Sequence, residues 1–328
     1  MAKKRKAHYS GIGGQAVLEG VMMKNKEKYA VAVRKPDGEI EVEVENYQGL
    51  LHGNGFKELP FVRGIFNFAD SMILGTKCLN YSASFYEDED AKETVVDRAL
   101  NKMTRGRAEK VFTAMITIVS ILLAVGIFIV LPYFITSHFK EYVRSNALMT
   151  LIEGAIRILI FLVYVLGISF MKDIKRLYMY HGAEHKCINC LERGKPLTVR
   201  NVMHSSRLHR RCGTSFMFFV MFVSIILFFF IQVSNPLAKV ALRILLIPVI
   251  AGISYELIRL AGRSSNIFVR LLSVPGMLIQ RLTTKEPSKD MVEVAIASVE
   301  AVFDWKHYLA EEFGYKEKEA PVQKSREE

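Results

Sequence analysis

Cysteine is scarce in this sequence, and the few that are present do not form the pattern of a disulfide-stabilised protein. The four residues are Cys78, Cys187, Cys190 and Cys212, too few to hold 328 residues together through bridges. Three of them lie near histidines in the sequence, which favours a metal-binding or redox role.

The N-terminus also lacks the apolar core of a secretory signal. The basic run at residues 3–6 is followed by glycine and polar residues, where a signal peptide would carry its hydrophobic segment. We therefore expect no cleavable signal.

A basic patch interleaved with aromatic residues is missing as well, although the net charge is +11. Lysine and arginine instead gather at the ends of apolar segments, and 51% of all residues are hydrophobic. This distribution is typical of a membrane protein whose basic residues set its orientation and contact anionic headgroups. We expect the partner to be a lipid bilayer and not a nucleic acid.

Two long stretches contain no charged residue, Val111–Ser137 and Gly213–Ala238. Each exceeds the roughly 20 residues that a helix needs to cross a bilayer. Leu148–Met171 and Leu237–Ile258 are also apolar, although each carries a few charged side chains. The sequence therefore predicts a mainly α membrane protein with four transmembrane helices within residues 111–260.

Charged residues inside the two weaker spans should be paired, because an unpaired charge within a bilayer is costly. Glu153 and Arg157 are four residues apart and can meet on one helix face. Arg243 enters the fourth span at a similar depth, which predicts a contact with Glu153 between helices. We favour a structural role for these charges over a transport pathway.

Basic residues flank the predicted spans asymmetrically. They precede the first span, crowd the loop 172–212 between the second and third, and follow the fourth. The positive-inside rule therefore places both termini and this loop in the cytosol. Thiols in that compartment are reduced and free to bind metal.

The N-terminal residues 1–58 predict a small cytosolic β-hairpin region. Two strands are predicted, at Tyr29–Arg34 and Ile40–Glu45, with a Pro-Asp-Gly turn between them. The first stretch is mostly apolar, and the second alternates apolar and acidic residues. A glycine cluster lies before them, at residues 11–20. It is better explained by a tight turn than by phosphate binding, since no strand is visible before it.

Several other segments are apolar but too interrupted to cross a bilayer. Within residues 59–110, residues 59–84 predict an interfacial or re-entrant helix, and an acidic linker follows at Glu87–Asp90. Within residues 261–313, residues 271–282 are expected in the membrane interface, and residues 290–310 predict a soluble amphipathic helix. Residues 314–328 predict a solvated, disordered tail.

The loop 172–212 holds a dense group of potential metal ligands. On a helix, His181, Glu184 and His185 share one face, because side chains three and four residues apart are neighbours. His-x-x-Glu-His is also the motif of the inverzincin peptidases, in which the glutamate serves as general base. A third ligand could come from His204, His209, Cys212 or, in the fourth span, Glu256.

A second division of these residues predicts a structural zinc site. Cys187 and Cys190 form a Cys-x-x-Cys pair, and His209-x-x-Cys212 follows after eighteen intervening residues. Four such ligands would close the coordination sphere and leave no position for a substrate. A third interpretation has these histidines facing lipid headgroups without any metal.

Four motifs occur in order along the chain: GQAVLEGVMM at residues 14–23, HGAEHK at 181–186, RCGT at 211–214 and PGMLIQRLTT at 275–284. Together they resemble the YqhQ-like family of bacterial multi-pass membrane proteins, a domain of unknown function whose members are described as predicted metal-dependent enzymes. The resemblance implies a plasma-membrane (inner-membrane) protein with a metal site. It favours His181, His185, His209 and Cys212 as ligands over Cys187, Cys190 and His204.

Three functional classes remain. As an enzyme, the protein would be a metal-dependent hydrolase acting at the membrane, with zinc as the favoured metal and Glu184 as general base. As a non-enzymatic factor with a structural zinc site, it would assist membrane-protein insertion or assembly, or lipid organisation, with a membrane-protein partner. A transporter ranks third, because the predicted spans carry few polar residues. A homo-oligomer is compatible with all three classes.

Overall fold

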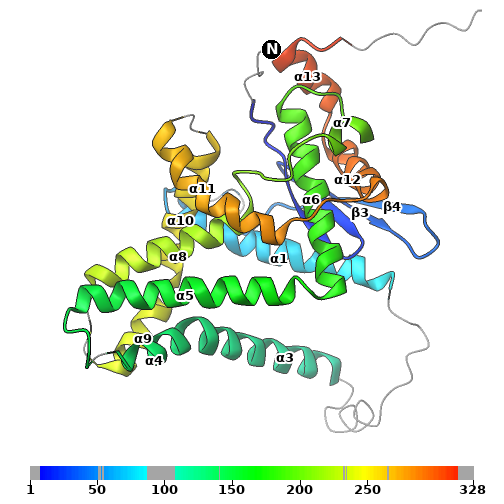
Figure 1. The fold of residues 1–328 in the computed structure, drawn as a ribbon. Coiled ribbons are helices and arrows are strands. Elements are labelled where there is room, and N and C mark those ends of the chain that lie inside the picture. Colours follow the sequence, from blue (N-terminus) through cyan, green and yellow to red (C-terminus); the bar gives the residue numbers. More distant parts are fainter. Residues whose placement is uncertain are drawn as a thin grey trace, which may run out of the picture. The chain divides into compact units, whose positions relative to one another are not determined.

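The computed structural model describes residues 8–50, 53, 55–86, 108–139, 141–231, 233, 235–263 and 266–316. The chain forms two compact units, and Figure 1 labels most of their elements. Unit 1 draws on residues 1–48, 176–209 and 284–328, and unit 2 on residues 49–175 and 210–283. The predicted acidic linker Glu87–Asp90 and most of the predicted tail lie outside the described residues.

Unit 1 contains a four-stranded antiparallel sheet in which each strand pairs with the next along the chain. The strands are β1 (Gly13–Val17), β2 (Gly20–Asn25), β3 (Lys28–Arg34) and β4 (Ile40–Asn46). The predicted hairpin is confirmed as β3 and β4, with Arg34 opposite Ile40. The turn expected over residues 11–20 is much shorter than predicted, because this stretch supplies β1 and the start of β2.

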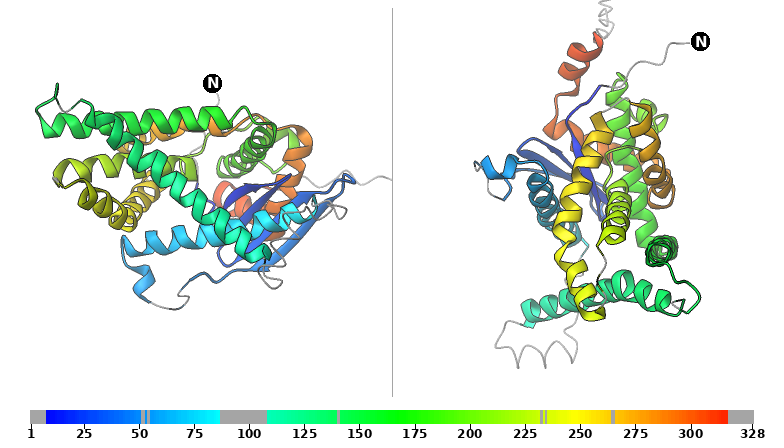
Figure 2. Two further views of the ribbon diagram at one scale, coloured as in Figure 1. Left: turned by 90° about the horizontal axis from the view of Figure 1, so that it is seen from below. Right: turned by 90° about the vertical axis from the view of Figure 1, so that its left-hand side faces the viewer.

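Unit 1 also contains four helices: α6 (Lys172–Glu192), α7 (Val199–Met203), α12 (Lys289–Val302) and α13 (Trp305–Phe313). The part of α6 that belongs to unit 1 begins at Arg176. Helix α12 packs on β2, β3 and β4, an arrangement that Figure 2 shows from two further directions. The hydroxyl of Ser298 on α12 donates to the Ala30 carbonyl of β3 at 3.1 Å.

The amphipathic helix predicted over residues 290–310 is interrupted, so that α12 and α13 are separate helices. The break occurs at Asp304, whose side chain accepts a hydrogen bond from the backbone N–H of His307 at 3.0 Å. An aspartate in this position caps the start of a new helix and so competes with continuation of the old one.

Unit 2 is helical within the described residues. Its elements are η1 (Gly55–Glu58), α1 (Val62–Ser84), α3 (Ala108–Val125), the π-helical η2 (Gly126–Val130), α4 (Leu131–Ser137), α5 (Asn146–Ile168), α8 (Gly213–Phe230), α9 (Pro236–Leu245), α10 (Ile247–Arg263) and α11 (Ile267–Thr283).

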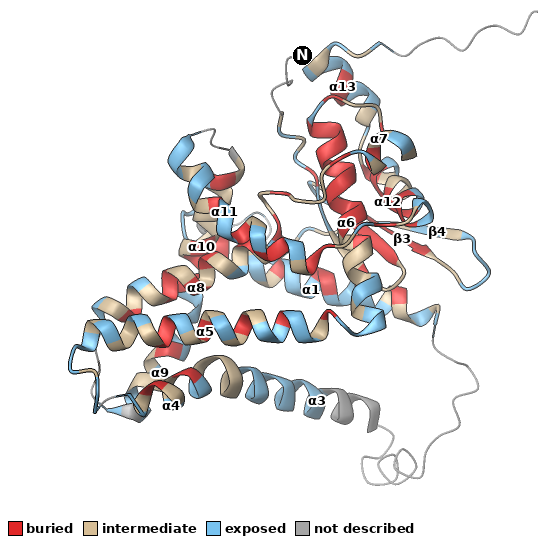
Figure 3. Ribbon diagram, viewed as in Figure 1, coloured by how far each residue is buried: buried red, intermediate tan, exposed pale blue. Residues whose placement is uncertain are grey.

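Three stretches of unit 2 are long and apolar enough to cross a membrane, Ala114–Ser137, Asn146–Ile168 and Gly213–Phe230. A fourth span is possible if α9 and α10 count as one, although they meet at an angle of 43°. Pro248 near the start of α10 accounts for the break, because proline has no N–H and disfavours helical backbone in the residue before it. Figure 3 colours the described residues of α3 mainly as exposed, as expected of a helix that faces lipid.

The two segments predicted to lie in the membrane interface, 59–84 and 271–282, form the helices α1 and α11. Helix α1 packs closely on α10, where Gly64 contacts Gly252, and Arg63 pairs with Glu256 at 2.5 Å. Helix α11 packs on α8, where Gln280 donates to the Ser215 hydroxyl at 2.7 Å. Their position relative to a bilayer stays a prediction.

Candidate metal centre

Helix α6 carries the HGAEHK motif through the core of unit 1. Every residue from Gly182 to Glu192 is buried, and Ala183, Cys187, Ile188 and Leu191 contribute to the main hydrophobic cluster of the unit. The polar members of the motif therefore lie on a different stripe of the same helix, because successive residues are rotated by about 100°.

The histidine–glutamate face predicted from the spacing is present. The rings of His181 and His185 have centroids 4.4 Å apart. One carboxylate oxygen of Glu184, Oε2, lies 3.9 Å from Nε2 of His181 and 4.0 Å from Nε2 of His185. These distances are too long for hydrogen bonds, so the carboxylate is near both nitrogens without occupying either of them.

The orientation of His185 is fixed by its second ring nitrogen. Nδ1 lies 2.7 Å from the carbonyl oxygen of Arg207, and the imidazole is almost completely buried. A carbonyl oxygen only accepts hydrogen bonds, so Nδ1 must carry the proton and Nε2 presents a lone pair in the neutral ring. Donation of the other N–H to a backbone carbonyl is the usual support for a metal-ligating histidine.

Glu184 is held in an apolar environment, with only 5% of its surface exposed. Burial raises the pKa of Glu184 from 4.5 to about 7, and His181 and a hydrogen bond from the Gly14 backbone oppose the rise only in part. A carboxyl group in this environment exchanges its proton near neutral pH, as a general base does.

Gly14 on β1 explains why the glycine-rich N-terminal motif accompanies the histidine motif. A Cβ at this position would lie 2.6 Å from the Met22 carbonyl oxygen and 2.9 Å from Cγ of Glu184. Only glycine lets the strand come this close to the glutamate. The glycine cluster thus serves close packing, and phosphate binding is not needed to explain it.

Gly182 has the same role on the other side of α6. A Cβ there would overlap the carbonyl oxygen of Lys285, which belongs to the segment that crosses the helix. The backbone N–H of Lys285 donates to the Tyr178 carbonyl at 2.8 Å and fixes this crossing. Lys186, the last residue of the motif, is buried and donates to the carbonyl oxygens of Met203 and Ser205 at 2.8 and 3.0 Å.

Cys212 is the third potential ligand beside His181 and His185. The ligand atoms of His181 and His185, both in unit 1, lie within 4.8 Å of one another. Cys212 follows His209, the last residue of a unit 1 segment, by three positions, so the chain limits their separation to about 11 Å. Tetrahedral zinc, with bonds of about 2.0–2.3 Å, would hold its ligands about 3.3–3.8 Å apart, so shifts of about 1 Å would suffice.

Two histidines proposed from the sequence lie outside this group. Nε2 of His209 lies 3.5 Å from Glu192, whose other carboxylate oxygen accepts a hydrogen bond from the Ser10 hydroxyl at 2.9 Å. His204 lies at the end of α7, with Nδ1 2.7 Å from the Arg200 carbonyl. His209 therefore lies next to the group, with ring centroids 5.7 Å from His185, but points to a carboxylate.

Cys187 and Cys190 are in the hydrophobic core and do not belong to the ligand group found among the described residues. The Cys190 thiol lies 3.5 Å from the Pro196 carbonyl, its hydrogen-bond acceptor. Burial raises the pKa of Cys187 well above its ordinary value and that of Cys190 to about 11. Because α6 continues to Glu192, both thiols are rotated away from His181 and His185. This geometry does not favour the four-ligand zinc alternative.

Glu256, the most remote of the proposed ligands, pairs with Arg63 within unit 2 through both carboxylate oxygens, at 2.6 and 2.5 Å. This bidentate pair fixes α1 against α10. It explains the position of the Glu256 carboxylate without a metal.

Residues 59–305 match the family model described as "Protein of unknown function (DUF1385)". The chain belongs to this family. It is also 36% identical over 287 residues to the "Uncharacterized protein YqhQ" of Bacillus subtilis (strain 168), an alignment covering 87% of this chain and 90% of the relative. No solved structure matches the chain. The DUF1385 match includes α6 and Cys212 but begins after the sheet of unit 1.

Three contributors to the site of this DUF1385 protein were not found from the sequence: the Arg207 carbonyl, the Gly14 backbone and the segment around Lys285. The first is a backbone group, for which a sequence gives no signal. The other two lie in the motifs at residues 14–23 and 275–284 or directly after them. The motifs themselves indicated that these segments matter, but a motif does not show which contacts its residues make.

Proposed function

We propose that this protein is an integral membrane protein with a divalent metal site formed by His181, His185 and Cys212. We further propose that it is a metal-dependent hydrolase acting at the membrane, with Glu184 as the general base. The main support is the His185 imidazole, whose Nδ1 is bonded to a backbone carbonyl so that Nε2 is directed toward Glu184.

The donor set fits zinc better than magnesium or calcium. Two imidazoles and one thiolate are nitrogen and sulfur ligands, whereas the harder cations prefer oxygen. Three protein ligands also leave one tetrahedral position open, which distinguishes catalytic from structural zinc sites. A zinc ion would supply a Lewis acid that polarises the bond to be cleaved.

The chain supplies the proton-transfer group beside that position. Among the described residues, the ion-pair contacts of Glu184 are the long ones to the imidazole Nε2 atoms, at 3.9 and 4.0 Å. In the proposed reaction, its carboxylate takes a proton from the attacking water and returns it to the leaving group. Gly14 on one side and Gly182 on the other keep the surrounding backbone close to α6, so that the carboxylate has little freedom to move.

The cellular location belongs to this proposal as well. The candidate spans support insertion in a membrane, and the basic residues of the loop 172–212 favour a cytosolic position for α6. A substrate at the inner face of the plasma membrane would then be within reach of the site.

A second function is favoured by one observation. Only 1% of the surface of His185 and 5% of that of Glu184 is exposed, which limits access for a substrate. A site closed in this way would stabilise unit 1 as a structural metal site, and the protein would then be a non-enzymatic factor for membrane-protein assembly or lipid organisation.

Metal analysis of the full-length protein, purified in detergent, tests the site. We expect about one zinc per chain in the wild type and in His204→Ala, and loss of metal in His185→Ala and His181→Gln. His204→Ala is the matched control, because it removes an imidazole from the same loop but outside the ligand group. Equal metal content in all four proteins, or none in the wild type, would refute the metal site.

Glu184→Gln then separates the two functions. We expect this variant to retain metal but to lose hydrolysis of a panel of phosphate-ester, carboxyl-ester and peptide substrates by about 10²–10⁴-fold, the usual contribution of a general base. Wild-type rates in the variant, or no hydrolysis by the metal-loaded wild type, would reject the enzyme and leave the structural site.

A further inference from the structure

A second polar cluster lies within unit 2, among the candidate membrane helices. Glu153 on α5 is buried and accepts from Arg157 at 3.1 Å and from Nη2 of Arg243 on α9 at 2.8 Å. Lys239, one turn before Arg243, has its amine 3.8 Å from the same carboxylate. The cluster thus joins two helices of unit 2 through one acidic residue.

The charges of this cluster do not balance. Among the described residues of this cluster, three basic side chains surround one carboxylate, which leaves a net charge of +2. Nε of Arg157 is buried without a hydrogen-bond acceptor among the described residues, whereas Nη1 of Arg243 lies 2.5 Å from Oε1 of Glu153. Excess positive charge among apolar helices is unfavourable unless an anion or water compensates it.

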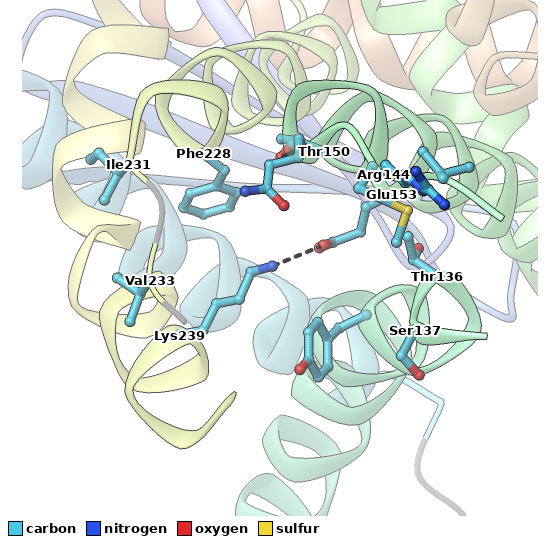
Figure 4. Close-up of a pocket in the computed structure, with 13 residues that line it drawn as sticks. Thr136, Ser137, Arg144, Thr150, Glu153, Phe228, Ile231, Val233 and Lys239 are labelled. Atoms are coloured by element: carbon cyan, nitrogen blue, oxygen red, sulfur yellow. Dashed lines mark hydrogen bonds and ion pairs between the residues drawn. The ribbon is translucent and has the colours of Figure 1, made fainter. Parts of the chain in front are cut away.

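A cavity opens directly on this cluster. It has a volume of about 420 Å³, and its wall includes Glu153, Lys239, Arg144, Asn146 and Phe228. Figure 4 shows Lys239 and Glu153 facing one another across it, with Phe228, Ile231 and Val233 on the same side as the lysine. The wall therefore combines cationic and apolar side chains.

The helix termini add to the positive potential of the cavity. Helix α5 begins at Asn146 in the cavity wall, and α9 begins three residues before Lys239. The first turn of a helix exposes N–H groups and attracts anions. The cavity also lies where α4 and α8 end, so it is at one end of the candidate spans, the level at which headgroups lie.

We propose that this cavity binds a phosphate group, carried either by an anionic lipid headgroup or by a soluble phosphate. A phosphate anion would offset the excess charge of the cluster and accept hydrogen bonds from Lys239 and Arg144. The apolar residues beside Lys239 would contact the glycerol and acyl part of a lipid. The lipid source rests on the proposed membrane insertion, whereas neither source depends on the metal site.

The test uses the full-length protein in detergent and native mass spectrometry with three probes: dimyristoyl phosphatidylglycerol, dimyristoyl phosphatidylcholine and inorganic phosphate. We expect phosphatidylglycerol to bind more tightly than phosphatidylcholine. In Lys239→Gln and in Arg144→Gln, its apparent Kd should rise about tenfold or more, as expected for loss of a hydrogen bond to a charged group. Arg144 is exposed, so its variant tests binding even if Lys239→Gln fails to fold.

Two control variants distinguish the effect of losing a positive charge from the effect of its position in the cavity. Arg270→Gln removes an exposed positive charge from α11 of the same unit, outside the cavity wall, and should bind as the wild type does. Lys239→Arg keeps the charge in the cavity and should retain binding. Saturable binding of inorganic phosphate that is lost in Lys239→Gln would assign a soluble source. Equal binding of both lipids together with no phosphate binding, or the same loss in Arg270→Gln, would overturn the proposal.

Discussion

Replacing Gly182 by alanine tests how unit 1 is assembled around the candidate metal centre. The added methyl group would overlap the carbonyl oxygen of Lys285, a backbone atom that cannot rotate away. The chain at Lys285 would have to move off α6, which would break its hydrogen bond to Tyr178. The variant therefore tests a close approach that no flexible side chain can relieve.

The expected magnitude comes from three effects. Alanine favours a helix over glycine by about 1 kcal/mol. Overpacking costs about 1–3 kcal/mol, and the lost hydrogen bond about 1 kcal/mol more. Because the unfavourable effects are larger, we expect Gly182→Ala to lower the free energy of unfolding of unit 1 by about 1–3 kcal/mol, although it improves helix propensity.

Tryptophan fluorescence during chemical denaturation measures this change selectively. Trp305 is the single tryptophan of the chain, and it packs at the edge of the hydrophobic core of unit 1. Gly13→Ala is the matched control, because a Cβ at Gly13 has no neighbour within 4 Å. That variant should stay within about 0.5 kcal/mol of the wild type. If Gly182→Ala were as stable as this control, the close approach of Lys285 to α6 would be refuted.

Two further predictions concern the same unit. Gly14→Ala should destabilise unit 1 by about 1–3 kcal/mol, because the added Cβ would lie 2.6 Å from the Met22 carbonyl oxygen. The same fluorescence assay measures this change, and a stability equal to that of the Gly13→Ala control would contradict the prediction. The Cys190 thiol, with its pKa raised by burial to about 11, should be about one part in a thousand thiolate at pH 8. We therefore expect its alkylation by iodoacetamide, followed by peptide mass spectrometry, to require denaturant, and rapid labelling of the native protein would disprove this.

The parts of the site that depend on local spacing could be predicted from the sequence. Residues three and four apart on one helix must share a face, so the proximity of His181, Glu184 and His185 followed from their numbers alone. The contact between Glu153 and Arg243 was predicted for a different reason, that buried charges in apolar helices require partners, and it is confirmed.

The parts that depend on contacts between distant segments could not be predicted. Cys187 and Cys190 have the spacing of a zinc site, and only the continuation of α6 to Glu192 shows that they are turned into the core. The glycines at positions 14 and 20 suggested a turn because no alternation marks the strands that contain them. Their role is to let one backbone approach another, and that requirement is visible only when both segments are placed.

The composition of the HGAEHK motif supports a ligand at its centre. Packing accounts for Gly182, for Ala183 in the hydrophobic core, and for Lys186 with its carbonyl partners. Packing does not account for His185 and Glu184, because apolar side chains of similar size would fill the same space without the desolvation of a carboxyl group. That desolvation is reflected in the raised pKa of Glu184. A divalent cation among these side chains would offset the cost by interacting favourably with the carboxylate, which supports the proposed metal centre.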